Sequence, residues 1–158
     1  MPYISAQPAL DRDLIKRSRP LAKVEGTEAT KLIFRNLFVD GKDIEIGVII
    51  FNYFTAVRLK WPKSWDSMES GNILNKTNGF RALMWFLRRV YVNLRHKSVV
   101  PDVNGFKEIF DRMDLPDGDF TTEHYKPGTS GESELRKALL EQSKLDEGFA
   151  KPTQPTLI

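Results

Sequence analysis

Residues 42–60, which read KDIEIGVIIFNYFTAVRLK, decide the fold of this chain. Apolar side chains recur in this stretch at intervals of three and four residues, the spacing of one face of an α-helix. They are Ile46, Ile49, Ile50, Tyr53, Phe54, Val57 and Trp61, and the face is widened by Val48, Phe51 and Leu59. Pro62 ends the predicted helix, because the residue before a proline avoids helical backbone angles. A helix that is apolar around so much of its circumference is expected at the centre of the core.

Further helices are predicted on both sides of this stretch. Residues 77–96 carry a second strong apolar stripe, and shorter amphipathic stretches occupy residues 103–113 and 130–145. Residues 27–39 fit a short buried helix, although the continuous apolar run 32–34 leaves a strand open. The predicted fold class is mostly α, a single helical domain of about five helices.

The sequence also suggests where the helical domain begins and ends. We expect the domain to span residues 28–146. Residues 1–27 are expected to be a flexible N-terminal segment, because three prolines interrupt any helix there. Residues 147–158, with two further prolines, are expected to be a flexible C-terminal tail.

The composition excludes several classes of protein. The chain has 158 residues, which suits one domain, and no cysteine, which excludes disulfides, thiolate metal sites and cysteine nucleophiles. No stretch approaches the roughly 20 apolar residues of a membrane span. Asp11, Arg12 and Asp13 lie where a signal peptide would need an apolar core. We therefore expect a cytoplasmic protein that does not associate with membranes.

Charge is distributed unevenly along the chain. The formal net charge is only +3, but residues 1–100 carry an excess of eight positive charges and residues 101–158 an excess of five negative ones. Residues 70–101 contain six Lys or Arg and no acid. Such asymmetry suggests an anionic partner for the first part of the chain.

The positive charges of residues 77–96 gather on one face of the predicted helix, with an indole among them. Arginines about seven residues apart can follow phosphates while the indole stacks on a base or a ribose. With a cation at the start of the helix added, the candidate nucleic-acid-binding residues are Lys76, Arg81, Trp85, Arg88, Arg89 and Arg95.

A second interpretation of the same face needs no nucleic acid. No acid within the predicted helix can form i, i+4 ion pairs with these arginines, so their partners must come from elsewhere. They could be the acids that follow directly, Asp102, Glu108, Asp111 and Asp114. The sequence leaves both interpretations open.

Residues that could carry catalysis are scarce. Neither His96 nor His124 has a second ligand at a metal-binding spacing, and no phosphate-binding loop or nucleophile motif is present. Residues 128–131 are better interpreted as a helix cap than as an anion site. We expect no catalytic residue, no metal ligand, no cofactor and no enzymatic activity.

Four ordered segments resemble a known family. They are FNYF at 51–54, WPKSW at 61–65, ILNKTNGF at 73–80 with ALM at 82–84, and GTSG at 128–131. Together they resemble the C-terminal helical part of proteins that carry the DGQHR domain, a group that includes the DndB-like proteins associated with DNA phosphorothioation. The resemblance covers residues 45–142.

This resemblance implies a helical half-domain, a truncated or stand-alone relative in a DNA-modification, defence or mobile-element setting. It transfers no catalytic residue, because the Asp-Gly-Gln-His-Arg motif is absent. The family positions that match are Lys76, Thr77 and Gly79. Their own chemistry suggests a cation at a helix start, a cap and a small residue that allows close approach.

The leading hypothesis is a non-enzymatic, DNA-associated accessory or regulatory protein that binds nucleic acid through the basic helix. The alternative is a helical protein–protein interaction module or a homodimer without nucleic acid. Its anchors would be Trp61, Trp65 and Trp85, because Trp is enriched at the energetic centres of interfaces. A third hypothesis is an enzyme completed by a second polypeptide, to which this chain contributes a helical lid.

Overall fold

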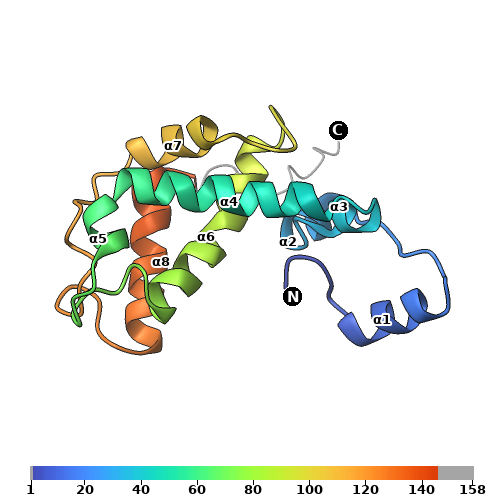
Figure 1. Ribbon diagram of the computed structural model, residues 1–158, viewed down its shortest axis with the longest axis horizontal. Helices are drawn as coiled ribbons and strands as arrows, with labels where there is room; N and C mark the ends of the chain where they lie inside the picture. Colours follow the sequence, from blue (N-terminus) through green and yellow to red (C-terminus); the bar gives the residue numbers. More distant parts are fainter. Residues whose placement is uncertain (1, 146–158) are drawn as a thin grey trace, which may run out of the picture.

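Two long helices, α4 (Asp43–Lys60) and α6 (Thr77–Leu94), form the framework of the fold (Figure 1). The computed structural model describes residues 2–145. Helix α7 (Val103–Asp111) packs against α4, and α8 (Thr129–Ser143) packs against α6. Residues 2–145 contain eight helices and no strand, and five of these helices have seven or more residues. The predicted mostly α, single-domain fold is confirmed.

The core between these helices is rich in aromatic side chains. Tyr53 is fully buried and lies with its ring centre 5.5 Å from that of Phe106. Its hydroxyl donates a hydrogen bond of 2.7 Å to the Leu83 carbonyl and so joins α4 to α6. Trp61 is also fully buried, and its Nε1 donates to the Leu115 carbonyl at 2.7 Å. These rings therefore add buried apolar area without leaving a polar atom unpaired.

One face of α4 is not covered by the core. Ile44, Val48, Phe51 and Leu59 are 81%, 40%, 71% and 54% exposed, and they follow one another at helical spacing. The prediction that Val48, Phe51 and Leu59 widen the core face is therefore wrong. Helix α4 is apolar on more sides than its neighbours in the fold can cover, and periodicity alone does not say which side stays open.

The start of α6 is fixed by a close backbone approach. A Cβ on Gly79 would lie 2.3 Å from the carbonyl oxygens of both Ile73 and Leu74, so only glycine fits. The predicted role of Gly79 is confirmed. The role predicted for Thr77 is wrong, because Thr77 is the first residue of the helix, and Lys76 takes the capping position without a side-chain cap bond.

The N-terminal part is more helical than the sequence predicts. Helix α1 (Pro8–Lys16) begins at Pro8, because the first turn of a helix does not use the N–H that proline lacks. The expectation that the prolines exclude helices from residues 1–27 is therefore wrong. Helix α1 stands apart from the other helices (Figure 1), and a buried ion pair between Asp11 and Arg35 connects it to them. Residues 147–158 lie outside the described residues.

Residues 27–39 contain two short helices instead of one. Helix α2 (Gly26–Lys31) packs against α6, and α3 (Arg35–Val39) packs against α4. The apolar run 32–34 between them is buried as predicted, but it forms no strand. Another short helix, α5 (Pro62–Asp66), follows α4 directly. No helix within residues 2–145 is long and apolar enough to cross a membrane.

Candidate binding site on α6 and α8

The outer face of α6 is partly covered by α8. Arg81 Nε lies 3.3 Å from Glu132 Oε2, and Arg136, one turn along α8, pairs with the other oxygen of the same carboxylate. The Glu132 side chain is only 7% exposed, whereas that of Arg81 is 59% exposed. An acid of the same chain, Glu132, therefore neutralises part of the positive charge on the basic face.

Trp85 lies among these charges. The guanidinium carbon of Arg89 is 5.5 Å from its ring centre, and that of Arg136 is 5.4 Å from it. These are cation–π distances, and such contacts fix the indole in place. Trp85 is half-buried, so part of its surface is available to another molecule.

Arg88 differs from its neighbours. Within residues 2–145 it donates no hydrogen bond and forms no ion pair, and its buried Nε has no acceptor, which is also true of the Nε of Arg136. Burial raises the pKa of Tyr3, and the charges of Arg88 and Arg136 oppose this effect, so both guanidinium groups act on the Tyr3 hydroxyl. We use the name arginine cluster for Arg81, Arg88, Arg89 and Arg136, which gather with Glu132 around Trp85.

The two remaining predicted residues have structural contacts away from this cluster. Arg95, just beyond the end of α6, donates from Nη1 to the Ala29 carbonyl at 3.0 Å and so ties α6 to α2. Lys76, just before the start of α6, donates from Nζ to the carbonyls of Glu69 and Ser70 at 3.2 and 3.4 Å. The fold therefore brings together four of the six predicted residues: Arg81, Trp85, Arg88 and Arg89.

The acids expected to pair with the basic face are engaged elsewhere. Asp102 accepts a hydrogen bond of 2.7 Å from the Gly105 N–H and caps α7, while Asp111 pairs with Lys107 on its own helix. None of the ion pairs among residues 2–145 joins Glu108 or Asp114 to α6. The identity of the partner was therefore predicted wrongly. The i, i+4 spacing of Glu132 and Arg136 predicts their pair within α8, but it does not indicate the pairing of Glu132 with Arg81 of α6.

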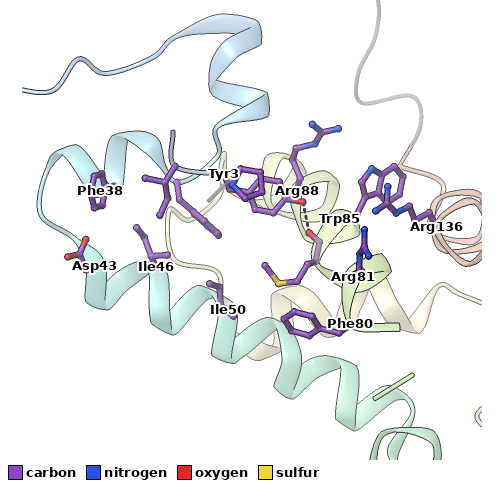
Figure 2. Close-up of a pocket in the computed structure, with 14 residues that line it drawn as sticks. Tyr3, Phe38, Asp43, Ile46, Ile50, Phe80, Arg81, Trp85, Arg88 and Arg136 are labelled. Carbon is purple, nitrogen blue, oxygen red and sulfur yellow. Dashed lines mark hydrogen bonds between the residues drawn. The ribbon is translucent and has the colours of Figure 1, made fainter. Parts of the chain in front are cut away.

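An apolar groove of about 760 Å³ opens beside the arginine cluster. Figure 2 shows α4 forming one side and α6 the other, with the N-terminal residues above them. Its apolar lining includes Tyr3, Ile4, Phe38, Ile46, Ile50, Phe80 and Met84. Arg81, Arg88 and Arg136 line one end, and Asp43 lines the other. We call this feature the α4–α6 groove.

The tryptophans predicted to anchor a partner are mostly engaged within the fold. Trp61 is fully buried and cannot reach a second molecule, so that part of the prediction is wrong. Trp65 is half-buried, and its ring centre lies 5.6 Å from that of Phe54. Only Trp85 lies at the candidate site.

The fold and the site define an all-helical domain with an arginine cluster at the end of an apolar groove. Residues 2–145 contain no group of three or more acidic or histidine side chains placed to hold a metal ion. Comparisons with protein-family models, curated proteins and solved structures gave no match. The resemblance to DGQHR-domain proteins therefore stays a prediction.

Proposed function

We propose that the chain is a non-enzymatic, nucleic-acid-associated accessory or regulatory protein that contacts phosphates through the arginine cluster. The observation that supports this proposal lies around Trp85, where Arg81 and Arg136 share the carboxylate of Glu132 and Arg88 has no acceptor within residues 2–145. The resemblance of the sequence to DGQHR-domain proteins supports a DNA-modification, defence or mobile-element setting as part of this proposal.

The cluster has chemistry suited to phosphate. A guanidinium group is planar and offers paired N–H donors, which match two phosphate oxygens at once. Arg88 has no acceptor within the described residues, and most of the Arg81 side chain is exposed, so both can take one. Trp85 is half-buried beside them, so its exposed part can contact a base or a ribose.

Titration of fluorescein-labelled single-stranded and duplex DNA at two salt concentrations tests this function. We expect affinity to fall steeply with salt, because bound phosphates release counterions. The variant Arg88→Glu with Arg89→Glu should lose binding. A matched control, Arg58→Glu with Lys107→Glu, makes the same charge change on α4 and α7 and should retain most of it. Binding that ignores salt, or none tighter than about 10⁻⁴ M at low salt, contradicts the proposal.

A second candidate function is self-association through the exposed face of α4. Four exposed apolar side chains follow one stripe of this helix: Ile44, Val48, Phe51 and Leu59. The first turn of α4 is acidic, with Asp43 and Glu45, and the last turn is basic, with Arg58 and Lys60. Two antiparallel copies of α4 would therefore place unlike charges together at both ends, as a twofold interface requires.

Light scattering over a range of protein concentrations tests this second function. We expect a dimer that forms with rising concentration and that Phe51→Glu prevents, since a charge would then face the apolar stripe of the second copy. Leu10→Glu, on exposed α1, is the matched control and should leave the dimer intact. A monomer at every concentration contradicts self-association.

A further inference from the structure

The α4–α6 groove has the size and lining of a small-molecule site. Its volume of about 760 Å³ lies within the roughly 300–1,000 Å³ of ligand pockets. Ile46 and Ile50 of α4 face Phe80 of α6 across it (Figure 2), and Met84 of α6 also lines it. A ligand that fills this space must offer an apolar body, because these walls give it no hydrogen-bond partner.

The charges of the groove fix the direction in which such a ligand would lie. Arg81, Arg88 and Arg136 line the end near α8, and Asp43 lies at the far end (Figure 2). An anionic group is therefore favoured at the arginine end and disfavoured at the other. Glu132 already binds Arg81 and Arg136, whereas Arg88 has no acceptor within residues 2–145.

Within residues 2–145, Arg88 thus provides a cation without an acceptor at the edge of an apolar space. A charged donor that is partly buried without an acceptor is costly, and native structures usually supply one. A carboxylate, sulfonate or phosphate monoester matches the guanidinium geometry. The apolar body attached to it would lie among the apolar residues of the lining, which include Met84 and Ile50.

We propose that the α4–α6 groove binds a small amphipathic anion, with its head on Arg88 and its apolar body between α4 and α6. The N-terminal residues complete the site, because the Tyr3 hydroxyl donates to the Met84 carbonyl at 2.6 Å and holds this segment over the groove. The proposal does not depend on nucleic-acid binding, since the apolar walls on α4 lie outside the arginine cluster.

Displacement of a fluorescent probe tests this site. The probe is 1-anilinonaphthalene-8-sulfonate, which has an aromatic body and one anionic group. Decanoate, decyl phosphate and decanol are the competitors, and they share one alkyl chain. We expect the dissociation constants of both anions, obtained from the displacement curves, to be about tenfold lower than that of decanol, because only the anions provide a charged acceptor for Arg88. The ratio between the two anions identifies the preferred head group.

Two variants separate the head from the body of the ligand. Arg88→Gln should weaken both anions about tenfold and leave decanol unchanged. Ile50→Trp should fill the groove and abolish displacement by all three competitors. Val48→Trp makes a comparable change on the exposed face of α4 and should leave displacement unchanged. Circular dichroism of each variant verifies that the helices are intact.

Two results would overturn the proposal. One is equal affinity for decanol and the anions, and the other is undiminished displacement from folded Ile50→Trp protein. Neither result concerns DNA. Ile50→Trp changes only the groove, so the salt-dependent affinity for DNA should be the same in this variant as in the wild type. Failure of the groove and failure of the nucleic-acid function are therefore distinguishable.

Discussion

Glu132 of α8 lies 3.3 Å from the Nε of Arg81 on α6, and the same carboxylate also binds Arg136. The acid is buried, and the arginine side chains on either side of it are 59% and 33% exposed. One carboxylate thus holds two guanidinium groups of the arginine cluster in position and reduces its charge. It stabilises the packing of α8 on α6 and at the same time competes with any external anion.

Glu132→Gln should therefore shift the balance between these two effects. We expect the free energy of unfolding to fall by about 1 kcal/mol, because the released arginines can be solvated. If the cluster binds nucleic acid, DNA affinity at low salt should rise, and the dependence of log affinity on log salt should steepen by about 0.9. Urea unfolding and salt-dependent titration measure the two quantities. If the arginines serve only to hold α8, stability falls with no gain in binding.

The ion pair between Asp11 and Arg35 makes a second prediction. Both side chains are nearly buried, and Arg35 Nη2 donates to Asp11 Oδ1 at 3.1 Å. Asp11→Asn should lower the free energy of unfolding by about 3 kcal/mol, because it leaves a buried cation without its partner. Asp13→Asn is the matched control. It removes an exposed pair with Arg17 on the same helix and should cost about 0.5 kcal/mol or less.

The same pair predicts a dependence of stability on pH. The hydrogen bond from Arg35 lowers the pKa of Asp11 below the ordinary value of an aspartate. A carboxyl group whose pKa is lowered by folding adds stability above its unfolded pKa, and this stability is lost as the pH falls through the folded pKa. The free energy of unfolding of the wild type, measured with urea, should therefore fall over that acidic range. Asp11→Asn should show a shallower loss there, and an identical loss would contradict this account.

Two glycines predict opposite responses to the same substitution. Gly79→Ala should lower the free energy of unfolding by about 2 kcal/mol or more, since the new Cβ would lie 2.3 Å from two carbonyl oxygens. Gly47→Ala should raise it by about 0.5–1 kcal/mol, because this glycine lies inside α4 with no atom within 4 Å of a Cβ. Thermal unfolding at low protein concentration measures both. Equal effects of one sign would refute the packing argument.

Local patterns predicted the helices well. Helix α6 was expected over residues 77–96 and spans Thr77–Leu94, and α4 was expected from residue 42 and begins at Asp43. Both helices are long, and their apolar residues repeat at helical spacing, so the sequence contains enough information to place them. The role of Gly79 could be predicted from the residue type, because a glycine at a helix start indicates a close backbone approach.

Features that depend on distant parts of the chain were not predicted. The acid that neutralises Arg81 is Glu132, which lies on a different helix, and no spacing rule connects the two. The open face of α4 depends on how many helices pack around it, so Phe51 and Ile50 could not be distinguished by their periodicity. The α4–α6 groove is formed by segments far apart in the sequence, the N-terminal residues, α3, α4, α6 and α8, and therefore becomes visible only in the folded chain.

Asp117 also contacts a distant part of the chain, and its contacts lead to a further prediction. Its Oδ2 accepts a hydrogen bond from the Lys63 N–H and its Oδ1 one from the Ser64 N–H, both at 2.8 Å, so it caps α5 from a distant loop. Burial alone would raise the pKa of this carboxyl, but the two N–H donors outweigh it and lower the pKa. Asp117→Ala should lower the free energy of unfolding by about 1–2 kcal/mol at neutral pH, as the loss of a helix cap does.

The contribution of this cap depends on pH. Because folding lowers the pKa of Asp117, the cap adds stability above the unfolded pKa, and this stability is lost as the pH falls through the folded pKa. The difference in free energy of unfolding between the wild type and Asp117→Ala, measured with urea, should therefore become smaller at acidic pH. Asp119→Asn, whose carboxyl accepts no hydrogen bond within residues 2–145, should show no such difference. If this difference in free energy of unfolding stays constant from neutral to acidic pH, Asp117 acts through packing instead of charge.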